Sequence, residues 1–270
     1  MTAMITPQAF DAVVSTLRSF FTDLGFLEVH TQNRLSILAA CEDPTTVSTF
    51  EYAGNIWPLP QTGQMWLEHE LLRNPALRGV FCVSTSYRLE PNPVTGRHDL
   101  IFPMFEFEAP GGMDDLENLE RQLCEHLGFG KAESFKKWRY QDAARVYEVD
   151  EIGHEEEFTL CADNKGVVFL SDFPYHTSPF WNMRKNGDTA NKIDVLLKGM
   201  ETIGSAERSS DPDEMREQFH TISDGGYAKL LYDIFGKKRV EAELENFLAN
   251  DFFPRFGGGI GLTRLIRAMS

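Results

Sequence analysis

The sequence predicts an α+β fold in which a mostly antiparallel sheet is flanked by helices. Apolar residues repeat at helical spacing near the N-terminus, and several later segments alternate as strands do. The helical stretches between these strands differ in length, which argues against regular βαβ units. With 270 residues, 42% of them hydrophobic, the chain can bury a full core, and no repeat divides it. We therefore expect a single domain over residues 1–270.

The first third of the chain is expected to contain a helix, two strands and a second helix. From Pro7 to Leu24 apolar residues recur every three or four positions, as in a helix with one buried face. Phe26 to His30 and Phe50 to Leu59 have the pattern of strands, and Met65 to Leu72 that of a helix.

The middle of the chain contains two strand-like segments, Val80 to Glu90 and Leu100 to Glu108. The loop between them carries prolines and a glycine, so we expect a long mobile hairpin loop that can close over a ligand. Further elements are expected as follows: a mostly helical stretch at 113–145, strands at Val167 to Ser171 and Ile193 to Leu197, and short helices over 211–249 with a break at Gly225–Gly226.

Composition excludes several classes of function. The net charge of -15 disfavours a large nucleic-acid footprint, because such binding needs lysine and arginine to displace counterions from phosphates. No stretch approaches the roughly 18 apolar residues of a membrane span. The four cysteines lack metal-type spacing and there is no secretory start, so we expect a cytoplasmic protein with reduced thiols.

Three segments combine residue types that suit a nucleotide. The first holds Arg88 and Glu90, followed by Arg97-His98 and Phe102. The second holds Asp194 and Glu201, whose hard oxygen ligands suit Mg²⁺. The third is the glycine run that includes Gly259 and Gly261, expected to open the C-terminal helix that carries Arg264. Glycines let a backbone approach a flat ligand closely, and an arginine can stack on a purine or hold a phosphate.

In order and spacing these segments resemble the catalytic core of the class II aminoacyl-tRNA synthetases, in the aspartate/asparagine branch, and the shorter asparagine synthetase-related proteins. The resemblance spans about residues 8–270. It implies ATP and Mg²⁺ as cofactors, with Asp194 and Glu201 as the magnesium ligands and Arg88 and Arg264 as the catalytic cations. It also implies that Glu90, Arg97, His98, Phe102, Gly259 and Gly261 bind the nucleotide.

The resemblance extends to an amino-acid pocket. It implies Glu42 for the substrate ammonium, Gln64 for its polar backbone atoms and Arg208 for the end of its side chain, and His176 lies in a segment that resembles the pocket loop. Aspartate-specific relatives have a lysine where this chain has Leu67, which favours asparagine or another neutral polar end.

Three other departures from the family's pattern stand at Gln32, Ile101 and Thr263. Gln32 replaces a proline in the segment that forms the family's homodimer, which is nevertheless the expected oligomeric state. His154, with the glutamates at 155–157, could hold a metal, although an exposed acidic helix start is the better interpretation.

Three functions fit this sequence. The leading hypothesis is a free-standing ligase, without an anticodon-binding domain, that adenylates aspartate, asparagine or a close analogue and transfers it to ammonia or a small amine. Binding of tRNA is then not expected. The second is aminoacylation of tRNA or of a protein, and the third is a non-catalytic paralogue that senses amino acid or ATP.

Overall fold

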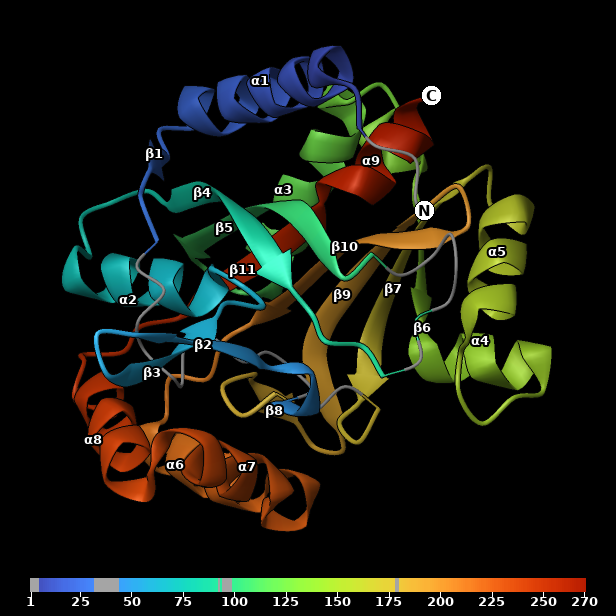
Figure 1. Cartoon of the computed structure of the whole chain (residues 1–270). Coiled ribbons are helices and arrows are strands. Elements are labelled where there is room, and N and C mark those ends of the chain that lie inside the picture. The colour runs from blue at the N-terminus through green and yellow to red at the C-terminus, as the bar shows by residue number, and fades with distance from the viewer. Residues whose placement is uncertain (1–4, 32–43, 92, 94–98, 178–179) are drawn as a thin grey trace.

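In the computed structural model, which describes residues 5–31, 44–91, 93, 99–177 and 180–270, nine strands form one sheet (Figure 1). Their order is β1-β4-β5-β11-β10-β9-β7-β6, and β8 pairs with β9. Only the pairs at its two ends, β1 with β4 and β6 with β7, are parallel among the described strands. The α+β class predicted from sequence is confirmed.

The strands of the sheet have these bounds: β1 Leu27–Glu28, β4 Val80–Tyr87, β5 Ile101–Pro110, β6 Lys136–Arg139, β7 Val167–Pro174, β8 Lys185–Asn186, β9 Thr189–Leu197, β10 Met200–Glu207 and β11 Arg255–Gly261. A separate ribbon pairs β2 Ser48–Tyr52 with β3 Asn55–Leu59. The α-helices are α1 Pro7–Asp23, α2 Gln64–Arg73, α3 Met113–His126, α4 Tyr140–Tyr147, α5 His154–Asp163, α6 Pro212–Thr221, α7 Gly226–Phe235, α8 Lys237–Leu248 and α9 Leu262–Met269, with 3₁₀ turns at Pro44–Thr46, Ala132–Ser134 and Ile222–Gly225.

Helices α1, α3 and α9 pack together on one face of the sheet, around a core rich in phenylalanine (Figure 1). Helix α1 begins as its sequence dictates: the Thr6 hydroxyl accepts a hydrogen bond from the backbone N–H of Ala9, and Pro7 is the first helical residue. Its buried residues Val13, Val14, Leu17, Phe20 and Phe21 all belong to the apolar face predicted for it.

The opposite face of the sheet carries two separate groups of helices. Helices α6, α7 and α8 pack with α2 in a second apolar cluster, and α4 and α5 pack against β7 and β9 in a third (Figure 1). None of the helices in the described part of the chain is long and apolar enough to cross a membrane.

Several predicted elements needed correction. The strand expected over Phe50 to Leu59 is the β2–β3 hairpin, because Ala53 and Gly54 turn the chain with φ angles of 52° and 73°. The stretch at 113–145 is mostly helical, as predicted, and the short strand β6 lies between its two helices α3 and α4. The glycine run does not open a helix. It forms β11, a central strand of the sheet, and α9 starts at Leu262 immediately after it.

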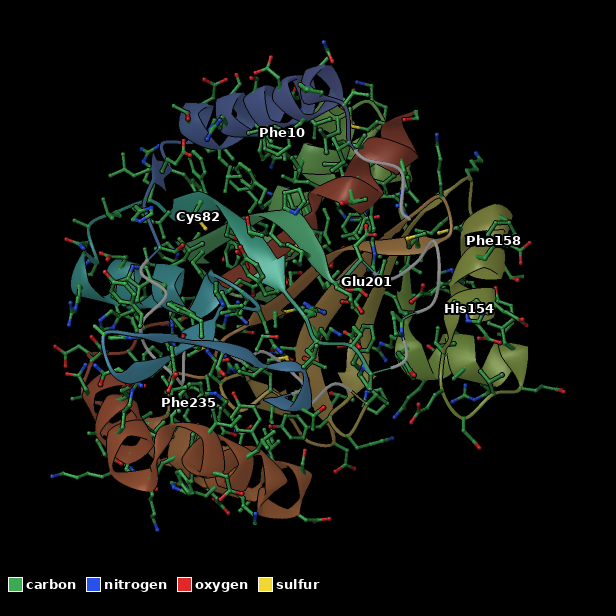
Figure 2. The ribbon with its side chains drawn as sticks, viewed as in Figure 1. Phe10, Cys82, His154, Phe158, Glu201 and Phe235 are labelled. Carbon is green, nitrogen blue, oxygen red and sulfur yellow. The ribbon has the colours of Figure 1, made fainter. Side chains whose placement is uncertain are left out.

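The acidic segment that follows His154 is the first turn of α5. Glu155, Glu156 and Glu157 lie in that turn, and the Glu156 carboxylate accepts a hydrogen bond of 2.8 Å from the backbone N–H of Gly153. Negative charge at a helix N-terminus is stabilising. Figure 2 shows His154 and Phe158 on this outer helix. This first turn of α5 confirms the interpretation as an acidic helix start.

Glu120 in α3 is an acid enclosed in the core beneath the sheet. It is completely buried, and burial raises the pKa of its carboxyl well above the ordinary value of 4.5, with the Ser205 hydroxyl opposing this. As the pH rises through the ordinary value, the unfolded chain loses this proton while the folded chain keeps it. The contribution of Glu120 to the free energy of unfolding is therefore most favourable at low pH and becomes less favourable as the pH rises.

We expect Glu120→Gln, which cannot ionise, to become more stable relative to the wild type as the pH increases. The difference in free energy of unfolding should grow by about 1.4 kcal/mol for each pH unit over which only the unfolded state is ionised. Urea unfolding of both proteins between pH 5 and pH 8 measures it, with the exposed Glu133→Gln as control. A difference that stays constant with pH would contradict an uncharged Glu120.

Candidate active site

Two cavities meet on the face of the sheet that is not covered by α1, α3 and α9. The larger, of about 300 Å³, lies over β9 and β10 and reaches Arg208, and the smaller, of about 110 Å³, extends to Arg264 on α9. Five residues line both: Arg88, Met104, Glu201, Gly204 and Gly259. The segments singled out in the sequence therefore converge, and Figure 2 shows Glu201 near the middle of the molecule.

Arg88 lies at the junction of the two cavities, just after the end of β4. Its backbone N–H donates to the carbonyl of Leu100, 2.9 Å away, which fixes the residue against the start of β5. Its guanidinium lies over the ring of Phe102, 5.7 Å from the ring centre. A half-buried cation held in this way is oriented before any ligand arrives, which is what stabilisation of developing negative charge requires.

Asp194 on β9 and Glu201 on β10 converge above Gly204. A Cβ atom at Gly204 would lie 3.0 Å from Oε1 of Glu201 and 3.6 Å from Oδ1 of Asp194, so the missing side chain leaves room between the two carboxylates. Lys192 pairs with Asp194 at 3.2 Å, and Arg264 pairs with Glu201 at 3.5 Å. Two carboxylates around an open position fit Mg²⁺, which completes its coordination with water and phosphate oxygens.

The smaller cavity presents the features of a nucleotide site. It is lined by Glu90, Phe102, Gly261 and Arg264, all of which were predicted from sequence, and by the buried Thr263. The Arg264 guanidinium donates to the backbone carbonyl of Glu201 at 2.8 Å, so α9 is joined to the hairpin of the two carboxylates. A flat ring and arginines beside side-chain-free backbone can hold a purine nucleotide.

The larger cavity ends at a buried group of four charges. Arg208 donates to Oε1 of Glu108 from Nε at 3.0 Å and from a terminal nitrogen at 2.5 Å, and that terminal nitrogen also donates to Oε1 of Gln64 at 2.8 Å. Beside this pair, Arg255 binds Glu68 at 2.7 Å with both side chains fully buried. Burial raises the pKa of the Glu108 carboxyl, and the Arg208 guanidinium opposes that rise. The two carboxylates balance the two guanidiniums.

Helix α2 delivers Gln64 to this pocket, and Glu106 anchors the start of that helix. The Glu106 carboxylate accepts hydrogen bonds from the backbone N–H of Gly63, at 2.9 and 3.0 Å, and from the hydroxyls of Thr62 and Ser84. A carboxylate at a helix N-terminus is favoured by the unpaired N–H groups and by the helix dipole. The position of Gln64 is thus set by a residue on the central strand β5.

Glycines of β11 are required where neighbouring side chains cross it. A Cβ at Gly257 would lie 2.0 Å from the Glu108 carboxylate, and one at Gly259 would lie 2.7 Å from Gln64 Nε2. On the other face, a Cβ at Gly258 would lie 2.8 Å from Phe107 and from Ser205. The glycines therefore admit the side chains of the pocket and of the core.

The remaining predicted site residues have different outcomes. Glu42, Arg97 and His98 lie outside the described residues, so their roles stay predictions. His176 is exposed and is not among the lining residues of the larger cavity, which Thr177 and Phe180 reach instead. Leu67 lies on the buried face of α2, in an apolar cluster with Leu71, Val80 and Cys82, which explains why a leucine stands there.

Sequence reasoning missed Lys192 and Glu108 as parts of the pocket. Lys192 stands two residues before Asp194 and points to the same side of β9, since side chains alternate along a strand. This spacing could have identified it. Glu108 stands in the sequence as the last residue of a predicted strand, and its pairing with Arg208, 100 residues later, is not visible from the sequence.

Comparison with known proteins agrees with this geometry. A family model described as tRNA synthetases class II (D, K and N) matches residues 6–270. The aspartate–tRNA(Asp) ligase of Thermoplasma volcanium is 24% identical over 290 residues, which cover 95% of this chain and 63% of that protein. The cytoplasmic asparagine–tRNA ligase of Mus musculus is 27% identical over 249 residues, covering 78% of this chain and 44% of that protein.

Among solved structures, asparaginyl-tRNA synthetase from Pyrococcus horikoshii, complexed with asparaginyl-adenylate, superimposes with a TM-score of 0.78 at 20% identity. The match covers 97% of this chain and 64% of that one. Arginines, paired carboxylates and a glycine-rich strand around one cleft, on a sheet of this topology, define a class II synthetase catalytic core. The chain belongs to the class II tRNA synthetase family, in its aspartate/asparagine branch. It spans less than two thirds of the length of the curated relatives described above.

We expect Gly257→Ala to destabilise the protein by about 1–3 kcal/mol, because the new methyl group would force the Glu108 carboxylate away from Arg208. Gly261→Ala is the matched control, since its methyl group would lie 3.8 Å from the nearest side-chain atom, an ordinary contact. Urea unfolding of the two variants measures the difference. Equal stabilities would contradict the close packing of Gly257 against Glu108.

Proposed function

We propose that this protein activates an amino acid of the aspartate/asparagine type with ATP. A carboxylate oxygen of the amino acid attacks the α-phosphorus of ATP, the bond from that phosphorus to the bridging oxygen of the β-phosphate breaks, and pyrophosphate leaves. The products are an aminoacyl-adenylate and pyrophosphate. The observation that carries this proposal is the meeting of the two cavities at Arg88. Residues that suit a nucleotide, such as Phe102 and Arg264, line the smaller cavity, and residues that suit an amino acid, Gln64 and Arg208, line the larger one.

The residues divide the work of this reaction. Arg88, at the junction, neutralises charge that builds up on the α-phosphate. Arg264, Phe102 and Glu90 hold the nucleotide in the smaller cavity, and Gln64 and Arg208 orient the amino acid in the larger one. Mg²⁺ bound by Asp194 and Glu201 would neutralise phosphate charge and orient the phosphates. No covalent bond to the protein is formed.

The acceptor of the activated acyl group is the second part of the proposal. The curated relatives described above are named tRNA ligases, and this favours tRNA over the ammonia or small amine that the acidity of the chain suggested. Either acceptor captures an acyl-adenylate, formed at the α-carboxylate for transfer to tRNA and at the β-carboxylate if aspartate is amidated, so activation is tested first and transfer second. The homodimer expected for the family is likewise a proposal.

We expect Arg88→Ala to lower the rate of ATP–pyrophosphate exchange by about 10²–10³-fold, because a fixed cation at the reacting phosphate is lost. The exposed Arg145→Ala is the control and should exchange at the wild-type rate. Circular dichroism and urea unfolding should show both variants folded. An unchanged rate in folded Arg88→Ala would contradict the catalytic role, and no exchange by the wild type with any amino acid would favour a sensor.

For the acceptor, we expect incubation with ATP, a labelled amino acid and total tRNA to give acid-precipitable label that base treatment releases. The same reaction with ammonium in place of tRNA should form AMP only at the background rate. AMP release that rises with ammonium, with formation of the free amide and no charged tRNA, would instead identify an amide-forming ligase.

A further inference from the structure

Lys192 is a lysine buried in the floor of the larger cavity. Its side chain is 8% exposed, and lysine is among the residue types that are rarely buried without a partner. The ammonium lies 3.2 Å from Oδ2 of Asp194 and 4.4 Å from the centre of the Phe173 ring. The aromatic face and the carboxylate hold the desolvated cation in place. Burying a charge costs free energy, so a lysine at this position indicates either an ion pair that offsets the cost or a functional role.

The register of the sheet places Lys192 between the two ends of the cavity. It lies opposite Ala206 on β10, and Asp194 lies opposite Gly204. Arg208 follows Ala206 by two residues on the same face, and diagonal neighbours of this kind are about 7–8 Å apart at their Cα atoms. The ammonium and the Arg208 guanidinium thus border the space in which the side chain of a small amino acid would lie.

Arg208 alone is a weak reader of negative charge, because its own charge is compensated. Glu108 takes hydrogen bonds from two of its nitrogens and is fully buried against it. The lysine that aspartate-specific relatives have at the position of Leu67 is absent, and Leu67 itself faces the core. Lys192 places a lysine in the same cavity from a different strand.

We propose, on the basis of the activation reaction above, that Lys192 is a specificity-determining residue that binds a second carboxylate of the substrate. An ammonium has three N–H donors, so a substrate carboxylate can share it with Asp194. The substrate class is then a dicarboxylic amino acid of the aspartate type, and the carboxamide is the poorer substrate. This reverses the preference for a neutral end that Leu67 indicated in the sequence.

A competing interpretation gives Lys192 a purely structural role. Glu151 and Glu157 line the same cavity, so the lysine could serve only to balance the acids around it. A counter-ion of that kind would influence every substrate alike. A residue that recognises the substrate side chain would instead affect the binding of the dicarboxylic substrate far more than the binding of its amide.

The test compares aspartate and asparagine in ATP–pyrophosphate exchange, using Lys192→Met, which keeps the apolar stem on Phe173 and removes the charge. We expect kcat/KM for aspartate to fall by about 10–100-fold, as for loss of one hydrogen bond between charged groups, with little change for asparagine. Lys192→Arg should retain the preference for aspartate. Lys198→Ala, an exposed lysine on the turn of the same hairpin, is the control and should match the wild type.

Calorimetric binding of aspartate and asparagine, without ATP or added metal, tests Lys192 independently of the reaction. The wild type should bind aspartate more tightly, and Lys192→Met should lose that difference. Equal losses for both amino acids, or no loss, would overturn the assignment even if exchange is observed. Absence of exchange in the wild type, with the binding preference intact, would overturn the proposed reaction but not the role of Lys192.

Discussion

The candidate site depends on one steric constraint, the absence of side chains along β11. This strand lies between β5 and β10, and its glycines face crowded neighbours on both surfaces of the sheet. On the cavity face, Glu106, Gly259, Gly204 and Asp194 are paired in one row across four strands. Because the two middle positions are glycines, no side chain of this row lies between those of Glu106 and Asp194, and backbone forms the floor of the cavity there.

The buried charges act as the second constraint, since they set the shape of the larger cavity at its Arg208 end. Removing water from an ion costs several kcal/mol, and a buried pair recovers this only with close geometry and further hydrogen bonds. The pairs Glu68–Arg255 and Glu108–Arg208 meet both conditions, through contacts to Asn182, Gln64 and the Ser209 carbonyl. Such a network has one arrangement of low energy, so it orients Arg208 more narrowly than an exposed arginine could be oriented.

The local elements and most of the site could be predicted from the sequence, whereas the pairing of strands could not. Helix α1 follows from its own periodicity and cap. The glycine run was misassigned because the helical period of α9 begins next to it, while the partners that make β11 a strand are β5 and β10, far away in the chain. Arg88 and Arg264 could be named from motif spacing and resemblance. Lys192 could have been identified from its spacing to Asp194 on the same strand, but Glu108 could not, because its role arises from a contact with Arg208 across strands.

In a protein of net charge -15, a site for a nucleotide would need cations gathered locally, and the candidate site contains several that are paired with carboxylates. Lys192, Arg208 and Arg264 each hold a carboxylate, so the charge of each of these three cations is compensated within the protein. Of the three carboxylates, Glu108 is buried away from solvent, whereas Asp194 and Glu201 face the position that suits a divalent ion. Cation binding there would compete with Lys192 and Arg264 for the two carboxylates and direct both side chains toward anionic groups of the ligands. The same two pairs would thereby couple nucleotide binding in one cavity to recognition of a substrate carboxylate in the other.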